Sequence, residues 1–242
     1  APQLYNLDQS INWENYTFSN PAAIFNSSYT NENIQYLNSI NLQYTIAGNL
    51  TIKLNGGLNY QNFEEWSLKP HTINNPGTAS GQSSAYSQSY KSQQNRMSVI
   101  VEPQLNYHFG FTNHHFDVLL GSTYQQEKSK QSSFYGTGFE SNVFIQNIAA
   151  AKNKTINDFV NTEYKYLAFF GRFNYKFSNK YFVNLTGRRD GSSRFGPNNK
   201  FASFWAIGGA WLLSEEHFLK NQSWLSLAKL RGSIGVTGSD KI

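Results

Sequence analysis

The chain has 242 residues and a formal net charge of +5, and only 14% of its residues are charged while 16% are aromatic. The charged fraction is well below the roughly 25% of an average soluble protein, which argues against an ordinary soluble enzyme. Cysteine is absent, which excludes disulfides, thiolate metal sites and cysteine nucleophiles. The sequence lacks the run of about 20 apolar residues that a transmembrane helix requires. It also lacks a run of five basic residues, so we expect no nucleic-acid binding.

The N-terminal segment, residues 1–35, shows no sustained periodicity, and we expect irregular structure there with a bend at Asn20-Pro21. The first residues, Ala1-Pro2-Gln3, are not a basic n-region and no apolar stretch follows them, so no signal peptide is visible. An exported protein needs one. We therefore expect either that it has been removed or that the chain starts inside a longer polypeptide.

From residue 36 onward, apolar and polar residues alternate with a period of two, which is the pattern of β-strands. Segment 181–188 is an example, with apolar residues at Tyr181, Val183 and Leu185 and polar residues at Asn184, Thr186 and Arg188. We predict about eight strands, at 36–47, 50–68, 95–109, 114–136, 164–177, 180–190, 201–213 and 225–238. The polar set includes charges in several strands, so it is expected to face water. An apolar outside with a hydrated inside is typical of an antiparallel transmembrane β-barrel.

The connections between the predicted strands alternate in length. Short turns at 47–49, 111–113 and 178–180 alternate along the chain with long polar stretches at about 69–95, 137–163 and 190–200. Outer-membrane barrels have tight periplasmic turns and long extracellular loops, so we expect the long loops outside the cell and the turns at the other end. The 69–95 loop is expected to be mobile. In the turn at 214–223, we expect Ser214 to N-cap a short helix with Glu215 and Glu216 in its first turn.

Aromatic residues gather near the predicted strand ends, where membrane barrels carry interfacial girdles. They are Tyr60, Trp66, Tyr107, Phe109, Phe111, Phe177, Tyr181, Phe201, Trp211 and Trp224. Ordinary core packing explains any one of them equally well, but their joint placement favours girdles.

No pattern typical of a catalytic or metal site occurs in the chain. His114 and His115 are neighbours on one strand, so their side chains point to opposite faces and cannot chelate one ion together. Glu64-Glu65 and Glu215-Glu216 are adjacent pairs in the same way, and no nucleophile elbow, zinc-protease or phosphate-loop motif is present. We therefore expect no enzymatic activity, no cofactor and no metal.

The segment Gly187-Arg188-Arg189-Asp190-Gly191-Ser192-Ser193-Arg194-Phe195-Gly196 stands where a strand would leave the bilayer. Its Arg188, Arg189, Asp190 and Arg194 could contact an anionic substrate group or a partner lipoprotein. Alternatively, they form an Arg–Asp network that fixes the loop over the barrel rim, with Gly191 and Gly196 supplying the turn conformations. The structural interpretation is favoured. Substrate or lipoprotein contacts are expected from the long loops and from residues that face the lumen, such as Arg172, Asn174 and Asn184.

The same region carries a resemblance to a known family. Residues 188–200 (RRDGSSRFGPNNK) are followed by an aromatic strand ending in Trp211, by Ser214-Glu215-Glu216 with Phe218, and by a motif running from Leu227 to Gly238. This pattern resembles the SusC-like (SusC/RagA-type) TonB-dependent transporters in the outer membrane of Bacteroidota. Trp205 departs from the family by standing where Pro of an FPS motif is usual, and Ser239 replaces the usual Asn.

The resemblance implies that residues 1–242 are part of the β-barrel domain, in the C-terminal half of a barrel of about 22 strands. The family's plug with its energy-coupling box, and its terminal strands, are not visible in the sequence. The whole protein would be a multi-pass barrel in outer-membrane lipid that imports glycans or peptides. A SusD-like surface lipoprotein would be its partner, and the missing plug would connect it to the TonB complex.

Two other readings of the residues remain open. A self-contained eight-stranded barrel with a structural or adhesion role would require strand 36–47 to pair with strand 225–238. A soluble β-sandwich that binds carbohydrate would need a second sheet to cover one face, and the charges on the polar faces disfavour it.

Overall fold

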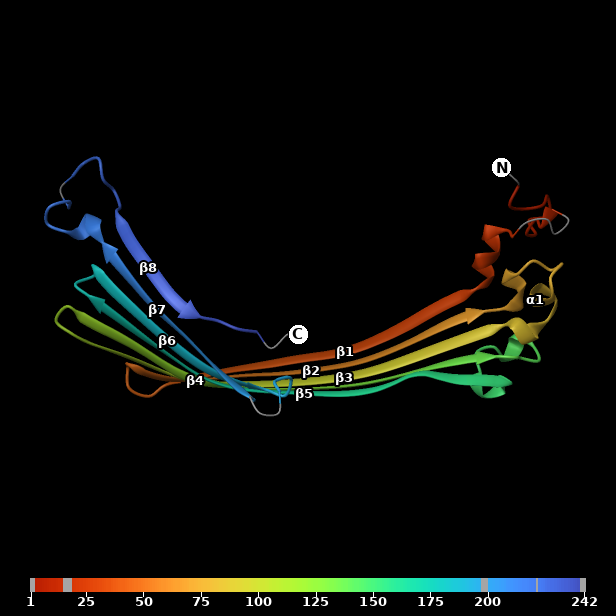
Figure 1. Cartoon of the computed structure of the whole chain (residues 1–242), viewed down its shortest axis with the longest axis horizontal. Coiled ribbons are helices and arrows are strands. Elements are labelled where there is room, and N and C mark those ends of the chain that lie inside the picture. The colour runs from red at the N-terminus through yellow and green to blue at the C-terminus, as the bar shows by residue number, and fades with distance from the viewer. Residues whose placement is uncertain (1–2, 15–18, 197–199, 221, 240–242) are drawn as a thin grey trace. The chain divides into compact units, whose positions relative to one another are not determined.

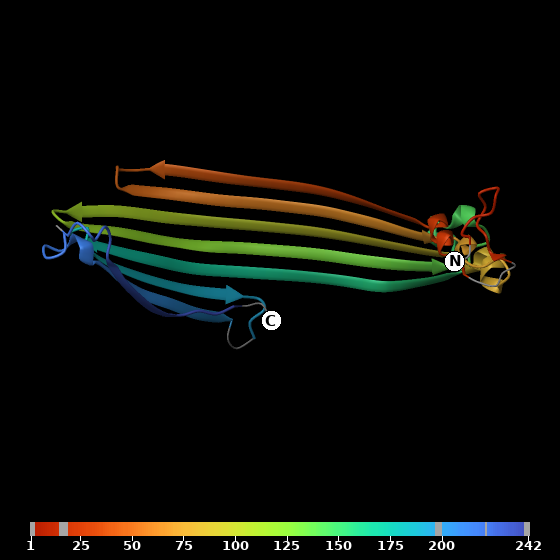
Figure 2. The ribbon, with the colours of Figure 1, turned by 90° about the horizontal axis from the view of Figure 1, so that it is seen from above.

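The computed structural model describes residues 3–14, 19–196, 200–220 and 222–239. Eight strands form one sheet in chain order, so each strand lies beside the next one in the sequence (Figures 1 and 2). The strands are β1 (Ser28–Thr45), β2 (Leu50–Lys69), β3 (Gln88–Phe111), β4 (His114–Thr137), β5 (Asn153–Phe177), β6 (Tyr181–Ser192), β7 (Phe201–Leu212) and β8 (Lys229–Val236). The predicted all-β, antiparallel fold with eight strands is confirmed.

The helices of the described residues are short, and they lie before β1 or between strands. These are η2 (Pro21–Asn26), η3 (His71–Ile73), α1 (Ala79–Gln82), η4 (Ser84–Tyr86), η5 (Asn142–Phe144), η6 (Ile148–Ala150) and η7 (Leu213–Glu215). None of the helices in the described part of the chain has the length and apolar character to cross a membrane. The bend expected at Asn20-Pro21 is the start of η2, where the Asn20 side chain accepts a hydrogen bond from Ala22 N.

Three strands begin earlier than the alternation predicts. β1 begins at Ser28 instead of 36, β3 at Gln88 instead of 95, and β5 at Asn153 instead of 164. The expectation of irregular structure up to residue 35 is therefore wrong for its last eight residues. These added segments are rich in polar residues on both faces, so no alternation marks them, while the main-chain hydrogen bonds of a sheet do not require apolar side chains.

The chain divides into two compact units, which are described separately. The first consists of residues 1–36, 60–97 and 128–162, and the second of residues 37–59, 98–127 and 163–242. In the first unit, the loop from 70 to 87 packs against the loop from 138 to 152. Ser84 Oγ donates to Phe139 O at 2.8 Å, and Ser87 Oγ donates to Asn142 Oδ1 at 2.6 Å. A small core of Phe139, Ile145, Ala151 and Leu68 lies with them. Two of the three expected long loops, those after β2 and β4, are thus joined in one hydrogen-bonded cluster.

In the second unit, the short turns lie together at one end. His108 N donates to Asn49 O at 2.8 Å, and Ser178 N donates to Asn113 O at 2.9 Å. Thr112, Ser178 and Asn179 have positive φ, as tight turns require. The loop after β6 leaves from the other end of that strand, as the alternation of connections predicts; its residues 197–199 lie outside the described part.

The strands of the second unit have one polar and one apolar face. Val183 and Leu185 of β6 are exposed, whereas Asn184 and Thr186 between them are half-buried. Directly opposite residues of neighbouring strands share a face, so the register extends both faces across β5 to β8. We call the side of Asn184 the polar face and the side of Val183 the apolar face.

Two expectations are corrected by the structure. Ser214 is not an N-cap: η7 begins at Leu213, directly after β7 ends, so Leu212 holds the N-cap position without a side-chain capping bond and Ser214 lies inside the helix. The closed eight-stranded alternative also fails. β1 and β8 are the two ends of the strand order and are not paired with each other in the described sheet. The described strands form one sheet, which leaves the sandwich alternative without its second layer.

Candidate functional site

The polar face of β5 to β8 is organised in rows that run across the strands. One row is Asn174, Asn184, Gly208 and Ser233, and the next row toward the turns is Lys176, Phe182, Ala210 and Arg231. β7 contributes only small residues to both rows, whereas the side chains of β6 and β8 on either side of it are larger and extend farther from the sheet. The result is a hollow of about 860 Å³ on the polar face.

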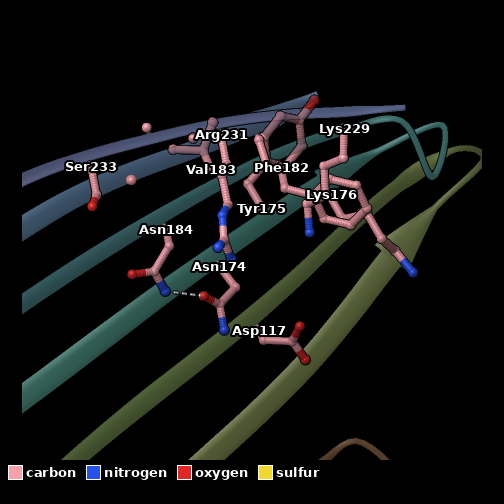
Figure 3. Close-up of a pocket in the computed structure, with 14 residues that line it drawn as sticks. Asp117, Asn174, Tyr175, Lys176, Phe182, Val183, Asn184, Lys229, Arg231 and Ser233 are labelled. Carbon is pink, nitrogen blue, oxygen red and sulfur yellow. Dashed lines mark hydrogen bonds between the residues drawn. The ribbon is translucent and has the colours of Figure 1, made fainter. Parts of the chain in front are cut away.

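Figure 3 shows how the side chains lie in this hollow. Asn174 and Asn184 point toward each other, and Asn184 Nδ2 donates to Asn174 Oδ1. The other polar or charged residues that line the hollow are Asp117, Lys176, Lys229, Arg231 and Ser233. Lys229 Nζ lies 5.8 Å from the centre of the Phe182 ring, and Asp117 pairs with His108. The hollow can therefore offer amide, hydroxyl and cationic donors to a ligand.

The structure thus brings together two of the three residues that the sequence singled out for substrate contact. Arg172 is on the same face, in the row next to the asparagine pair, opposite Thr186. It lines a second hollow of about 390 Å³, which it shares with Arg188 and Phe204. Arg172 and the asparagine pair are therefore neighbours on the polar face, but they line two different hollows.

Arg188 is the centre of a polar network on the polar face. Its Nε donates to Asp190 Oδ1 at 2.6 Å, and its Nη2 donates to the hydroxyl of Tyr166. The guanidinium also lies 5.4 Å from the centre of the Phe170 ring. The side chain of Asp190 is 15% exposed. The contacts are those of an Arg–Asp network at the end of a strand.

The adjacent Arg189 points to the apolar face, as alternation along a strand requires. Its guanidinium lies over Phe201 of β7, 5.5 Å from the ring centre. A Cβ added to Gly191 would come within 2.5 Å of the same ring. Neither Gly191 nor Gly196 has a left-handed φ, so the expected turn conformation is not their role. Gly191 is small because Phe201 occupies the space beside it.

Arg194 continues the segment past the end of β6. Its guanidinium lies 4.3 Å from the centre of the Tyr164 ring, and its main-chain N donates to Ser192 Oγ. Ser193 and Lys165 exchange hydrogen bonds, because Ser193 N donates to Lys165 O and Lys165 N donates to Ser193 Oγ. The start of the loop is thereby held against β5.

Aromatic rings form a continuous series on the apolar face near the turns. Ring contacts link Tyr107, Phe109, Phe111, His114, Phe116, Phe173, Tyr175, Phe177, Tyr181 and Trp211. The series crosses β3 to β7 at the level of the turns. This is the position of an interfacial girdle in a membrane barrel.

Glu216 lies at the end of this aromatic series and accepts three hydrogen bonds. It accepts from Tyr181 Oη at 2.7 Å, from Trp211 Nε1 at 3.0 Å and from Lys180 Nζ at 3.1 Å. The hydrogen bond from Tyr181, with those from Trp211 and Lys180, lowers the pKa of Glu216 to about 2. This role of Glu216 was not predicted from the sequence, which favoured the first turn of a helix for the residue. The nearby turn and aromatic residues were the only signal for it.

A family model described as TonB dependent receptor-like, beta-barrel matches residues 2–237. The chain belongs to this family. It is 30% identical to TonB-dependent receptor P3 of Formosa agariphila over 249 residues, which cover 100% of this chain and 24% of that receptor. It is 34% identical to TonB-dependent receptor SusC of Bacteroides thetaiotaomicron over 127 residues, covering 52% of this chain and 12% of SusC.

A solved structure supports the same assignment. The structure titled as that of the RagAB peptide transporter matches with a TM-score of 0.81 and 26% identity, covering 92% of this chain and 24% of that one. The predicted SusC-like resemblance is therefore confirmed. The chain spans about a quarter of the length of P3 and of the matched RagAB chain. The eight strands are thus a part of a larger TonB-dependent receptor barrel.

Metal binding finds no support in the described part of this receptor chain, where no three His, Asp or Glu side chains gather to hold an ion. His114 instead lies 2.8 Å from the Tyr175 hydroxyl through its Nδ1, within the aromatic series. Lys176, Lys229 and Arg231 were not predicted as site residues from the sequence. Their alternation places each on the polar face, but only the register shows that they border one hollow.

Proposed function

We propose that this chain is part of the wall of an outer-membrane importer, with its polar face toward the lumen and its apolar face toward lipid. The separation of the two faces carries the proposal. Phe201 and Trp211 mark the ends of the apolar face on β7, and 211 − 201 = 10 residue steps separate them. Ten steps correspond to roughly 33 Å of strand, or about 25 Å along the membrane normal at a tilt of about 40°. That height equals the apolar band of a membrane barrel.

The whole protein imports a glycan or a peptide and acts as a transporter, without catalysis. Its partners are a SusD-like surface lipoprotein and the TonB complex. SusC and RagAB, which this chain resembles over 52% and 92% of its length, support this part of the proposal. The asparagine pair, Arg172 and the cations of the hollow supply the polar wall along which such a solute would pass.

A deletion of the complete receptor gene tests the function. Cells with and without the gene are incubated with mixtures of oligosaccharides and of peptides, and the medium is analysed by mass spectrometry. We expect the deletion to abolish the depletion of at least one class of solute, and a protonophore to abolish it in the parent strain, because TonB-dependent import is energised. Depletion that is unchanged by the deletion, or that persists with the protonophore, would contradict the proposal.

The long loops lie outside the cell in this proposal, and the short turns lie in the periplasm. The difference in length between the two sets of connections supports this orientation. For the second unit, the girdle at the turns is then the periplasmic interface, and the Arg189–Phe201 contact lies at the outer one.

A further inference from the structure

The hollow on the polar face holds an excess of positive charge. Lys176, Lys229 and Arg231 line it, whereas Asp117 is the acidic residue of its lining. Asp117 is already engaged, because it pairs with His108. The three cations come from β5 and β8, on the two sides of the small residues of β7.

These cations lack acidic partners within the described part of the chain. No carboxylate there forms an ion pair with Lys176, Lys229 or Arg231. Two other cations of the same unit do form ion pairs, Arg188 with Asp190 and Lys180 with Glu216. Like charges around one concave surface repel one another, and the low-dielectric wall strengthens their joint field. The hollow is therefore attractive to an anion.

The neutral residues beside the cations suit an oxyanion. Only one hydrogen bond joins Asn184 to Asn174, which leaves further N–H donors on both amides. The hydroxyl of Ser233 lines the same hollow. Arginine can bind a carboxylate through two parallel N–H···O bonds, and lysines add compact charge. Figure 3 shows the Arg231 side chain on the same side of the sheet as the asparagine pair.

We propose that this hollow is a subsite for carboxylate groups, with Arg231 as the principal ligand residue and Lys176 and Lys229 supporting it. The proposal rests on the proposed function, since it names acidic peptides as solutes that the receptor binds. The carboxylate that binds in the hollow could come from a solute or, as a second source, from an Asp or Glu side chain in another part of the complete polypeptide. The experiment separates these two sources.

The complete receptor is purified in detergent, and binding of tri-glutamate with acetylated and amidated ends is measured by calorimetry in 50 mM and 500 mM NaCl, with tri-glutamine blocked in the same way as the neutral probe. We expect tri-glutamate to bind and tri-glutamine not to bind. Arg231→Gln should weaken binding about tenfold, as expected for the loss of one charge-assisted contact. The triple variant K176Q/K229Q/R231Q should abolish binding. Lys53→Gln, a change of a cation on β2 that does not line the hollow, is the matched control and should leave binding unchanged.

Salt and conservative replacement provide readouts that a general structural effect would not move. High salt should weaken tri-glutamate binding to the parent receptor at least tenfold, and Arg231→Lys should recover part of the affinity lost in Arg231→Gln. If tri-glutamate does not bind, the second source predicts a lower unfolding temperature for the triple variant than for Lys53→Gln. If neither effect occurs, the subsite does not exist. Because binding is measured without import, this result would leave the transport proposal standing.

Discussion

The two ends of the β6–β7 pair use the same residue types in different ways. At the turn end, the single carboxylate of Glu216 collects hydrogen bonds from Tyr181, Trp211 and Lys180. At the loop end, two consecutive arginines divide between the faces, with Arg188 bound to Asp190 and Arg189 over Phe201. Charged groups beside aromatic rings therefore fix each end of the wall, while simple alternation is sufficient for the strand between them.

The two ends differ in the kind of substitution that should destabilise them. The turn end depends on a charge, since all three partners of Glu216 donate to its carboxylate. The loop end depends on space as well, since Phe201 fills the position beside Gly191. Substitutions at the two ends should therefore fail for different reasons.

The largest effect is expected from a side chain added at the loop end. Gly191→Val places a Cβ within 2.5 Å of the Phe201 ring, and overpacking of this kind costs typically about 1–3 kcal/mol. Gly187→Val is the matched control, because the same strand and face offer open space there. Urea unfolding of the complete receptor in detergent measures both. Equal stability of the two variants would show that Phe201 does not restrict position 191.

Removal of the arginine network should cost slightly less. Arg188→Gln leaves the carboxylate of Asp190 without its ion pair, and a fully buried pair would lose about 3–5 kcal/mol. The Arg188 side chain is 39% exposed, so water compensates in part and we expect about 1–2 kcal/mol. Arg172→Gln, a change of a cation on the same face outside this ion pair, is the control in the same unfolding assay. A loss as large in the control would exclude a specific role for the Arg188–Asp190 pair.

The turn end should respond to pH instead. The pKa of Glu216 is lowered to about 2 in the folded protein, against about 4.5 for an ordinary glutamate. Its contribution to stability is therefore complete above about pH 4.5 and is lost as the pH falls toward 2. Glu216→Gln should lower the unfolding temperature at pH 7 and make it less dependent on pH in this window.

Glu215→Gln is the control for that experiment, because Glu215 contacts Lys220 at 3.4 Å and not the aromatic series. It should preserve the acid dependence of the parent receptor. If Glu216→Gln kept the full acid dependence, other carboxylates would have to explain it.

The smallest effect on stability, and the sharpest test of which end is outside, comes from single cysteines. These 242 residues contain no cysteine, so the segment gives no background of its own. Gly196→Cys at the loop end should react with a membrane-impermeant maleimide on whole cells, and His217→Cys at the turn end should react only after lysis. Both positions are exposed. Reaction of His217→Cys on intact cells would invert the orientation.

The sequence by itself determined the class of fold, the number of strands and their faces. A period of two follows from the geometry of a single strand, so residues such as Val183 and Asn184 reveal their faces without any partner. The sequence did not predict the starts of β1, β3 and β5, where both faces are polar. Strand pairing there depends on main-chain hydrogen bonds, which do not require an alternation of polar and apolar side chains.

Only the tertiary structure decided which polar residues meet. Asn174 and Asn184 contact each other because of the β5–β6 register, and Arg231 borders their hollow across β7, more than 40 residues along the chain from Asn184. A shift of one residue in any of these strands would move its side chains to the other face. The three donors to Glu216 likewise come from two strands and a turn. Such contacts depend on register and packing, and strand alternation does not contain that information.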